Sequence, residues 1–115
     1  MEIGIDIEQN ERFKNVTQKF IERAYTKSEI EYASKFVNKH EVFCSLWCVK
    51  EATVKAFSNL KIPFQDIEVS ATPEGRPFIV KNEVISNELK KLGMSEIKIS
   101  LSHAKDYSTA VCVIF

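Results

Sequence analysis

Residues 41–58 read EVFCSLWCVKEATVKAFS, a stretch with helical periodicity over about five turns. Its apolar side chains recur at intervals of three and four residues, at Val42, Leu46, Val49 and Thr53. Side chains at these intervals lie on one side of an α-helix. The pattern therefore predicts a long helix with one buried face.

The N-terminal residues 2–8, EIGIDIE, alternate strictly between two sets of side chains. One set is apolar and consists of Ile3, Ile5 and Ile7. The other set consists of Gly4 and the two acids Asp6 and Glu8. A period of two is typical of a β-strand with one buried face. We therefore predict a strand over these residues.

Two shorter helices are predicted between this strand and the long helix. Asn10 is a candidate N-cap for a helix over residues 11–24. Thr26 and Glu29 have the spacing of a capping box, which indicates a second helix that runs to about Lys39. The apolar face of this second helix is expected to bury Ile30, Ala33, Phe36 and Val37.

The second half of the chain alternates in short segments. Strands are predicted over 66–71, 76–81, 97–101 and 107–115. The turn residues 72–75, TPEG, make the first two strands a β-hairpin. Asn82 is the predicted cap of a short helix that Gly93 closes. Together these elements predict a single α+β domain over 1–115, with a small antiparallel sheet and helices packed on one face.

The composition is that of an ordinary folded domain, with 115 residues, 44% hydrophobic and 28% charged. Sixteen Lys and Arg balance sixteen Asp and Glu, which argues against a sequence-independent nucleic-acid binder. No apolar run approaches the ~18 residues of a membrane span, and no signal peptide is expected. Three cysteines without an export signal favour free thiols. We expect a cytoplasmic protein that binds neither nucleic acid nor membrane.

The acids of the first strand are candidate metal ligands. Asp6 and Glu8 are two residues apart, so their side chains point the same way at a separation of about 7 Å. Two carboxylates at this distance can approach one hard cation. A solvent-exposed strand face that carries two acids by chance explains the pair equally well.

Glu51 and Lys55 are four residues apart in the long helix and therefore share a face. Such a pair is common on exposed helices and contributes little to stability. Beside the acids of the first strand, however, Glu51 would complete a site of oxygen ligands. Lys55 would then supply a charge for a phosphate that the metal also contacts.

Residues 100–103, SLSH, place hydroxyls and an imidazole where a strand ends in a polar loop. These groups are suited to phosphate or ribose contacts, although an ordinary capped loop accounts for them nearly as well. Ser102 and His103 are adjacent and point to opposite faces of the strand. This argues against a nucleophile and base pair.

Together these motifs resemble the 4′-phosphopantetheinyl transferases. The chain length and motif order are similar to the short, single-domain branch, the holo-acyl-carrier-protein synthases. The resemblance covers nearly the whole chain. It is carried by GIDIE at 4–8, WCVKEATVKA at 47–56, FQDIEV at 64–69 and SLSH at 100–103.

This resemblance implies an enzyme that transfers the 4′-phosphopantetheine group of coenzyme A to a serine of apo acyl carrier protein. Adenosine 3′,5′-bisphosphate is the other product, and Mg²⁺ is the cofactor. Asp6 and Glu51 correspond to the magnesium ligands. Glu8 corresponds to a further ligand of the longer, two-lobed enzymes. The acceptor of the serine proton and the preferred type of carrier are left open.

The resemblance also assigns substrate contacts and an assembly. Glu51 and Lys55 are the expected catalytic residues, and the coenzyme A contacts are expected at Lys55, Ser102 and His103. The acidic carrier is expected to dock on Arg12, Lys19 and Arg23, and the enzyme is expected to be a homotrimer with sites between subunits. Two alternatives are a non-catalytic domain that binds a nucleotide or an acidic partner, and a magnesium-dependent nucleotide hydrolase.

Overall fold

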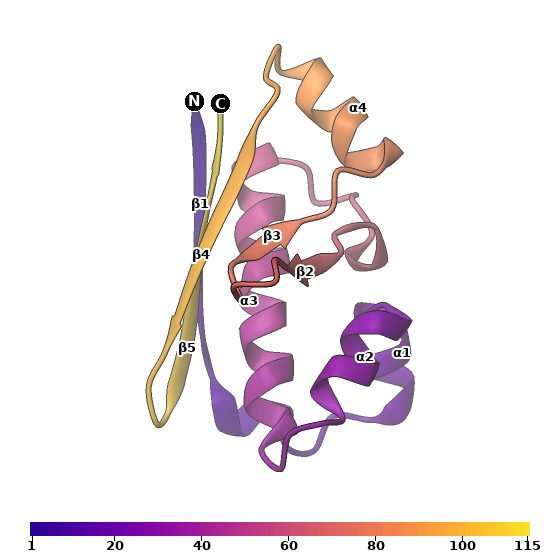
Figure 1. Ribbon diagram of the computed structural model, residues 1–115, viewed down its shortest axis with the longest axis vertical. Helices are drawn as coiled ribbons and strands as arrows, with labels where there is room; N and C mark the ends of the chain where they lie inside the picture. The colour runs from indigo at the N-terminus through magenta and orange to yellow at the C-terminus, as the bar shows by residue number, and fades with distance from the viewer.

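The main sheet has three antiparallel strands in the order β1–β5–β4, as the computed structural model of residues 1–115 shows. The strands are β1 (Glu2–Gln9), β4 (Ile97–His103) and β5 (Tyr107–Ile114). All helices lie on one side of this sheet (Figure 1). This arrangement confirms the predicted α+β class with helices packed on one face.

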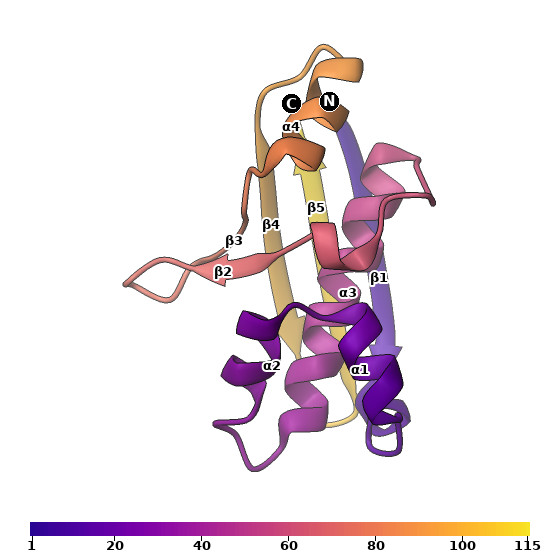
Figure 2. The same ribbon diagram turned by 90° about the vertical axis from the view of Figure 1, so that its right-hand side faces the viewer.

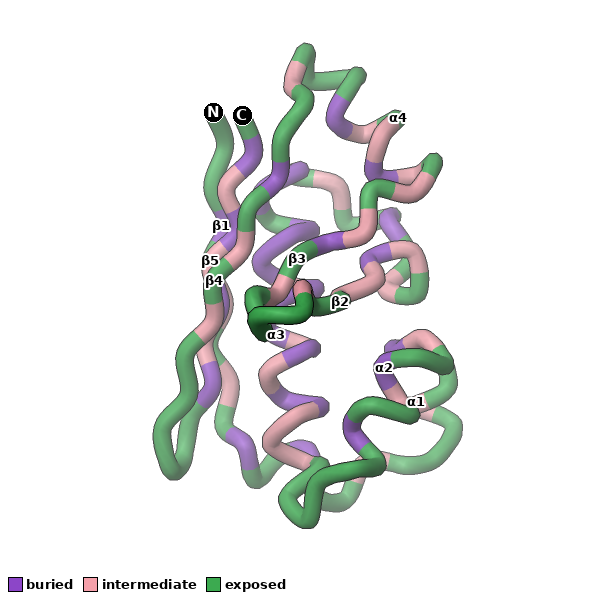
Figure 3. Tube along the Cα trace, viewed as in Figure 1, coloured by how far each residue is buried: buried purple, intermediate pink, exposed green.

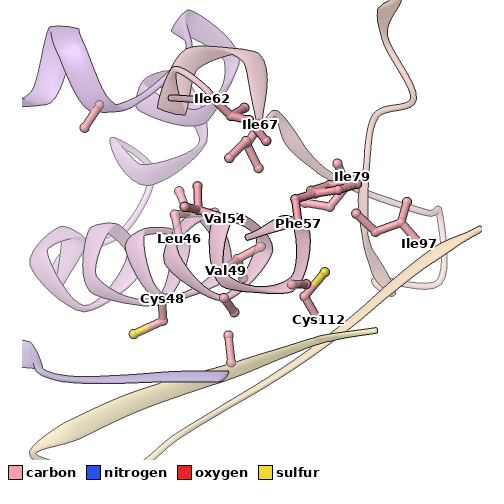
Figure 4. Close-up of a cluster of buried hydrophobic side chains, with 14 of the residues drawn as sticks. Leu46, Cys48, Val49, Val54, Phe57, Ile62, Ile67, Ile79, Ile97 and Cys112 are labelled. Carbon is pink, nitrogen blue, oxygen red and sulfur yellow. The ribbon is translucent and has the colours of Figure 1, made fainter. Parts of the chain in front are cut away.

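The long helix α3 (Lys39–Phe57) crosses the inner face of the sheet, between the sheet and the remaining elements (Figures 1 and 2). Its buried side chains form the centre of the core together with Ile67, Ile79 and Cys112 (Figure 4). Val49 is fully buried, which confirms the predicted apolar face. Neither this helix nor any other combines the length and apolar character needed to cross a membrane.

The face of β1 that packs on α3 is the face of Gly4, whereas the three isoleucines point away from the helix. Gly4 is buried, and Ile3, Ile5 and Ile7 are 66%, 63% and 61% exposed. The alternation therefore predicts the strand, but the apolar face is not the face covered within this chain. Figure 3 shows the exposed and partly exposed segments along the outer side of the sheet.

The segment predicted as one helix over 11–24 is divided into two. The 3₁₀ helix η1 (Asn10–Phe13) is followed by a short loop and by α1 (Gln18–Ala24). The cap of α1 is Thr17, whose hydroxyl accepts a hydrogen bond from the Phe20 amide at 3.1 Å. The prediction for Asn10 as a helix cap is wrong, because its side chain is buried and bonded elsewhere.

Helix α2 (Lys27–Ala33) begins with the predicted capping box. Thr26 accepts from the Glu29 amide at 3.2 Å, and the Glu29 carboxylate accepts from the Thr26 amide at 2.9 Å. The helix ends at Ala33, before the predicted end near Lys39, because the chain turns there to begin α3. Phe36 and Val37, predicted as buried, are 44% and 100% exposed.

The second half follows the predicted order of elements. After η2 (Phe64–Asp66), the strands β2 (Val69–Ala71) and β3 (Pro77–Ile79) form the hairpin, which is shorter than predicted and makes a sheet of its own. Helix α4 (Glu83–Lys91) is capped by Asn82, which accepts from the Ile85 amide at 2.9 Å. The predicted strands of the main sheet become β4 and β5.

A fully buried ion pair joins α2, α3 and the segment before the hairpin. Lys50 Nζ lies 2.8 Å from Glu29 Oε1 and donates to the carbonyls of Phe64 and Ile67, each at 2.8 Å. Glu29 Oε2 accepts from the Val69 amide at 2.8 Å. Burial lowers the pKa of Lys50, and the adjacent carboxylate opposes that shift. The pair fixes the rotation of α3 at the residue before Glu51.

Gly4 sets how closely β1 approaches α3. A Cβ at this position would overlap the Ala52 carbonyl oxygen and lie 2.6 Å from the Ala56 nitrogen. We expect Gly4→Ala to lower the free energy of unfolding by more than about 3 kcal/mol, because backbone atoms cannot yield as side chains do. Urea denaturation measures this loss.

The matched control is Gly75→Ala. Gly75 has φ +89° but an added Cβ there would meet nothing within 4 Å. Its substitution should cost about 1–2 kcal/mol from backbone strain alone. Equal losses for the two variants would contradict the steric explanation at Gly4.

Candidate active site

The acid of the first strand and the lysine of the long helix meet, as the sequence predicts. Lys55 Nζ lies 3.1 Å from Asp6 Oδ1 and donates to the Ile5 carbonyl at 2.9 Å. The Asp6 side chain is only 10% exposed, whereas that of Lys55 is 49% exposed. The lysine therefore reaches from solvent across β1 to a largely buried carboxylate.

One oxygen of Asp6 has no hydrogen-bond partner. Asp6 Oδ2 is buried and unpaired, and it is the only such side-chain atom in the chain. A buried carboxylate oxygen without a donor is unfavourable unless something else occupies it. A hard cation is the group that such an oxygen suits, so the donor set fits Mg²⁺.

Glu51 lies near these groups on α3, and their charges shift its pKa. Burial raises the pKa of Glu51 above its ordinary value, and the negative charge of Asp6 adds to the shift. Lys55 opposes it, and Glu8 contributes a smaller repulsion. A bound cation would relieve the same repulsion between neighbouring carboxylates.

Glu8 is paired differently. Its carboxylate accepts a hydrogen bond at 2.7 Å from Arg12, four residues further along the chain. No group of three His, Cys, Asp or Glu side chains is arranged so that it could hold a metal ion. Two carboxylates are enough for magnesium, which keeps several waters and is completed by substrate phosphates. Asp6, with its unpaired oxygen, and Glu51, with its raised pKa, are the residues that would hold such an ion.

His103 and Ser102 lie at the end of β4 and face opposite sides, as predicted. His103 pairs with the buried Ser108 and lines a cleft of about 1040 Å³ between α2, the β2–β3 hairpin and β4. Ser102 pairs with Thr109 and does not line this cleft. A ligand in this cleft could therefore contact His103 but not Ser102.

The carboxylate cluster and the cleft are on opposite sides of α3. β1, which carries Asp6, is one edge of the sheet, and β4, which carries His103, is the other (Figure 2). None of Asp6, Glu51 and Lys55 lines the cleft. Within one chain, the structure therefore brings together Asp6, Glu51 and Lys55 but does not bring His103 to them.

The basic residues predicted to dock a carrier lie on adjacent elements. Arg12 is on η1, and Lys19 and Arg23 are four residues apart on α1. All three are exposed. Lys19 and Arg23 make no ion pair, whereas Arg12 holds Glu8.

Sequence reasoning missed one residue of the cleft. Arg76, just before the hairpin strand β3, lines the cleft together with His103. Its only local signal is the turn TPEG that precedes it, and turn chemistry gives no information about what the hairpin packs against. The cleft depends on tertiary contacts that periodicity does not reveal.

Comparison with known proteins agrees with these features. The model of the 4′-phosphopantetheinyl transferase superfamily matches residues 2–112. The chain belongs to this superfamily. Holo-[acyl-carrier-protein] synthase of Aquifex aeolicus is 38% identical over 121 residues, which cover 97% of this chain and 96% of that protein. The similarity confirms the holo-acyl-carrier-protein synthase branch expected from the motifs.

Solved structures of the family share the fold. The crystal structure of Helicobacter pylori holo-[acyl-carrier-protein] synthase in complex with coenzyme A has a TM-score of 0.83 and 28% identity, with 98% of this chain and 99% of that chain covered. The Neisseria meningitidis enzyme has a TM-score of 0.89 and 24% identity, with 99% and 97% covered. The second likeness, at its lower identity, concerns the fold alone.

The raised pKa of Glu51 predicts a gain of stability when its charge is removed. An acid with a raised pKa in the folded state loses stability as the pH rises from its ordinary 4.5 through the folded value. Glu51→Gln should therefore raise the Tm at pH 7, and the gain should vanish below about pH 4. Thermal denaturation over pH 3.5–8 measures it.

Glu41→Gln is the control, because Glu41 is a half-buried acid in the first turn of the same helix and is not one of the charges that act on Glu51. A Tm for Glu51→Gln that stays below that of the unchanged protein at pH 7 would contradict the repulsion inferred for this site.

Proposed function

We propose that this chain transfers the 4′-phosphopantetheine group from coenzyme A to a serine of apo acyl carrier protein, with Mg²⁺, to give holo-acyl carrier protein and adenosine 3′,5′-bisphosphate. The relatives named above and the coenzyme A complex of one of them support this reaction. The observation that carries it is the unpaired, buried Asp6 Oδ2 beside Glu51 and Lys55. This arrangement offers both a cation site and a phosphate contact.

The reaction requires charge neutralisation and positioning. The serine oxygen of the carrier attacks a phosphorus of the pyrophosphate, and negative charge is concentrated on the phosphate oxygens. Because the nucleophile arrives on the carrier, the chain needs none of its own. Magnesium held by Asp6 and Glu51 would neutralise this charge.

Lys55 is placed to release the Asp6 carboxylate and bind a phosphate of the substrate instead. It contacts Asp6 Oδ1 at 3.1 Å, and its half-exposed ammonium can reach a phosphate that approaches from solvent. When a cation satisfies Asp6, the attraction between Asp6 and Lys55 weakens, and the lysine is free to hold the phosphate. In this proposal, Glu51 and Lys55 act as the catalytic residues.

Glu8 has a weaker claim as a ligand. Its contact with Arg12 at 2.7 Å neutralises the carboxylate, and a cation would have to compete with that contact. We therefore assign the metal to Asp6 and Glu51, with Glu8 as a further ligand only after Arg12 has moved.

A homotrimer accounts for two features of the single chain. The outer face of the sheet exposes Ile3, Ile5 and Ile7 next to Val111 and Val113 of β5. An apolar sheet face of this kind needs a cover. A neighbouring subunit would also bring its His103 cleft to the carboxylate cluster, from which His103 is separated in one chain. Coenzyme A would then span Lys55 of one subunit and His103 of the next.

The position of Ser102 restricts its expected contact with coenzyme A. Ser102 lies on the outer face with Thr109, so it contacts coenzyme A only if the ligand extends along that face between subunits. His103, which lines the cleft, is the residue of this segment that the geometry favours for the nucleotide end.

The carrier is proposed to dock on η1 and α1. Lys19 and Arg23 are exposed and unpaired, and Arg12 contacts Glu8 on the strand that also carries Asp6. An acidic partner attracted to these residues would deliver its serine close to Asp6 and Glu51.

The three cysteines are buried and form no disulfide, which supports the reducing cytoplasm as the proposed compartment.

The reaction is tested by intact-mass spectrometry of apo acyl carrier protein after incubation with coenzyme A, magnesium and this protein. We expect the carrier to gain one phosphopantetheine, and a chelator to abolish the gain. Asp6→Asn should slow the transfer at least about 100-fold, because it removes a charged ligand of the cation.

Glu11→Gln is the matched control, since Glu11 is an exposed acid a few residues away, with a side chain 85% exposed. It should transfer at the rate of the unchanged protein. An Asp6→Asn variant with normal rates would overturn the metal site. A folded protein that cleaves coenzyme A without a carrier, or that transfers to no carrier, would overturn the transferase.

The trimer is tested by light scattering coupled to size-exclusion chromatography. Ile5→Lys should dissociate the trimer into folded monomers and abolish transfer, because it puts a charge on the covered apolar face. Leu60→Lys changes a leucine that is 87% exposed outside the sheet, and it should leave the mass of three chains unchanged. A monomeric mass for the unchanged protein would refute the trimer.

A further inference from the structure

Asn10 is a buried polar residue that the proposed chemistry does not use. It is only 3% exposed, at the junction between β1 and η1. Its Nδ2 donates to the carbonyls of Ala104 and Lys105, each at 3.2 Å, and its backbone amide donates to the Asp106 carbonyl at 2.9 Å. One residue therefore holds three consecutive carbonyls of the β4–β5 turn.

The opposite side of Asn10 is held by two serines. Ser108 donates its hydroxyl to Asn10 Oδ1 at 2.6 Å, and Ser45 of α3 donates to the Ser108 hydroxyl at 3.1 Å. Ser108 is almost completely buried, and Ser45 lines the same cleft as His103. The side chain of Asn10 is thus fixed from the helix while it fixes the turn.

The turn has little else to hold it. Residues 104–107 are exposed; the Ala104 amide donates to the Tyr107 carbonyl at 2.8 Å, and Tyr107 is held by its pairing with Gln9 of β1. An exposed turn with few packed side chains samples many conformations unless its backbone is bonded elsewhere. Since His103 is the residue before this turn, the anchoring of 104–106 determines where the imidazole lies at the rim of the cleft.

We propose that Asn10 is a positioning residue for the binding of coenzyme A: it holds the 104–106 turn so that His103 is preorganised in the cleft. This inference rests on the proposed function, in which His103 contacts the nucleotide end of coenzyme A. A side chain that is already ordered loses less conformational entropy when its ligand binds. Asn10 acts only through His103 and contacts neither substrate.

A purely structural role is the competing explanation, and two variants separate it from positioning. Asn10→Ala removes the two side-chain bonds to the turn and the bond from Ser108, and leaves the backbone bond to Asp106. Asn82→Ala removes the two side-chain bonds of a half-buried asparagine away from the cleft, to the Asp66 carbonyl and from the Ile85 amide. Both variants lose hydrogen bonds and should lose stability, yet only Asn10→Ala loosens the turn.

The test is the affinity of the full-length protein for coenzyme A, measured by isothermal titration calorimetry. Asn10→Ala should weaken binding about tenfold, and Asn82→Ala should leave it within about twofold. In a His103→Ala background, Asn10→Ala should have no further effect, because there is no imidazole left to position. If Asn10→Ala does not fold, Asn10→Ser, which is too short to reach the turn, replaces it.

Steady-state kinetics provide a second readout. Asn10→Ala should raise the KM for coenzyme A and leave kcat and the KM for the carrier unchanged. Additive losses with His103→Ala, or equal losses for Asn82→Ala, would overturn the positioning role while the transferase stands. Absence of coenzyme A binding by the unchanged protein would instead overturn the proposed function.

Discussion

The contact between Gly4 of β1 and the backbone of α3 is the constraint on which the rest of the structure depends. Because Gly4 has no side chain, the helix lies directly against the strand at Ala52 and Ala56. Asp6 follows Gly4 on the same face, so the close approach carries its carboxylate to Lys55. A strand held further from the helix would keep the same residues but not the ion pair. Glycine at this position therefore serves the site as much as the fold.

The features that the sequence predicts well are those with local causes. The period of α3, the alternation of β1 and the capping box at Thr26 each depend on side chains within one turn or one strand. Asn10 shows where this reasoning ends. It has the right chemistry for a helix cap, but its partners are carbonyls more than ninety residues away. Nothing local distinguishes a cap from a tertiary anchor.

The isoleucine face of β1 illustrates a second limit. Alternation identifies two faces but not which one is covered, and the general preference for burying isoleucine points to the wrong one within this chain. The decision is made by α3, which fits only against the glycine. In the proposed trimer a neighbouring subunit covers the isoleucines and also brings a His103 to the carboxylates. Two independent features thus favour one assembly.

The charges around Asp6 and Glu51 support the proposed cation site. The other acid that acts on Glu51, Glu8, has a basic partner of its own in Arg12. Asp6 and Glu51 share the single Lys55, so three carboxylates face two basic groups. The remaining negative charge falls on the two residues where burial makes it most unfavourable. Asp6 keeps an oxygen without a partner for the same reason. The site therefore carries an excess of negative charge. A divalent cation bound there together with an anionic substrate would neutralise it.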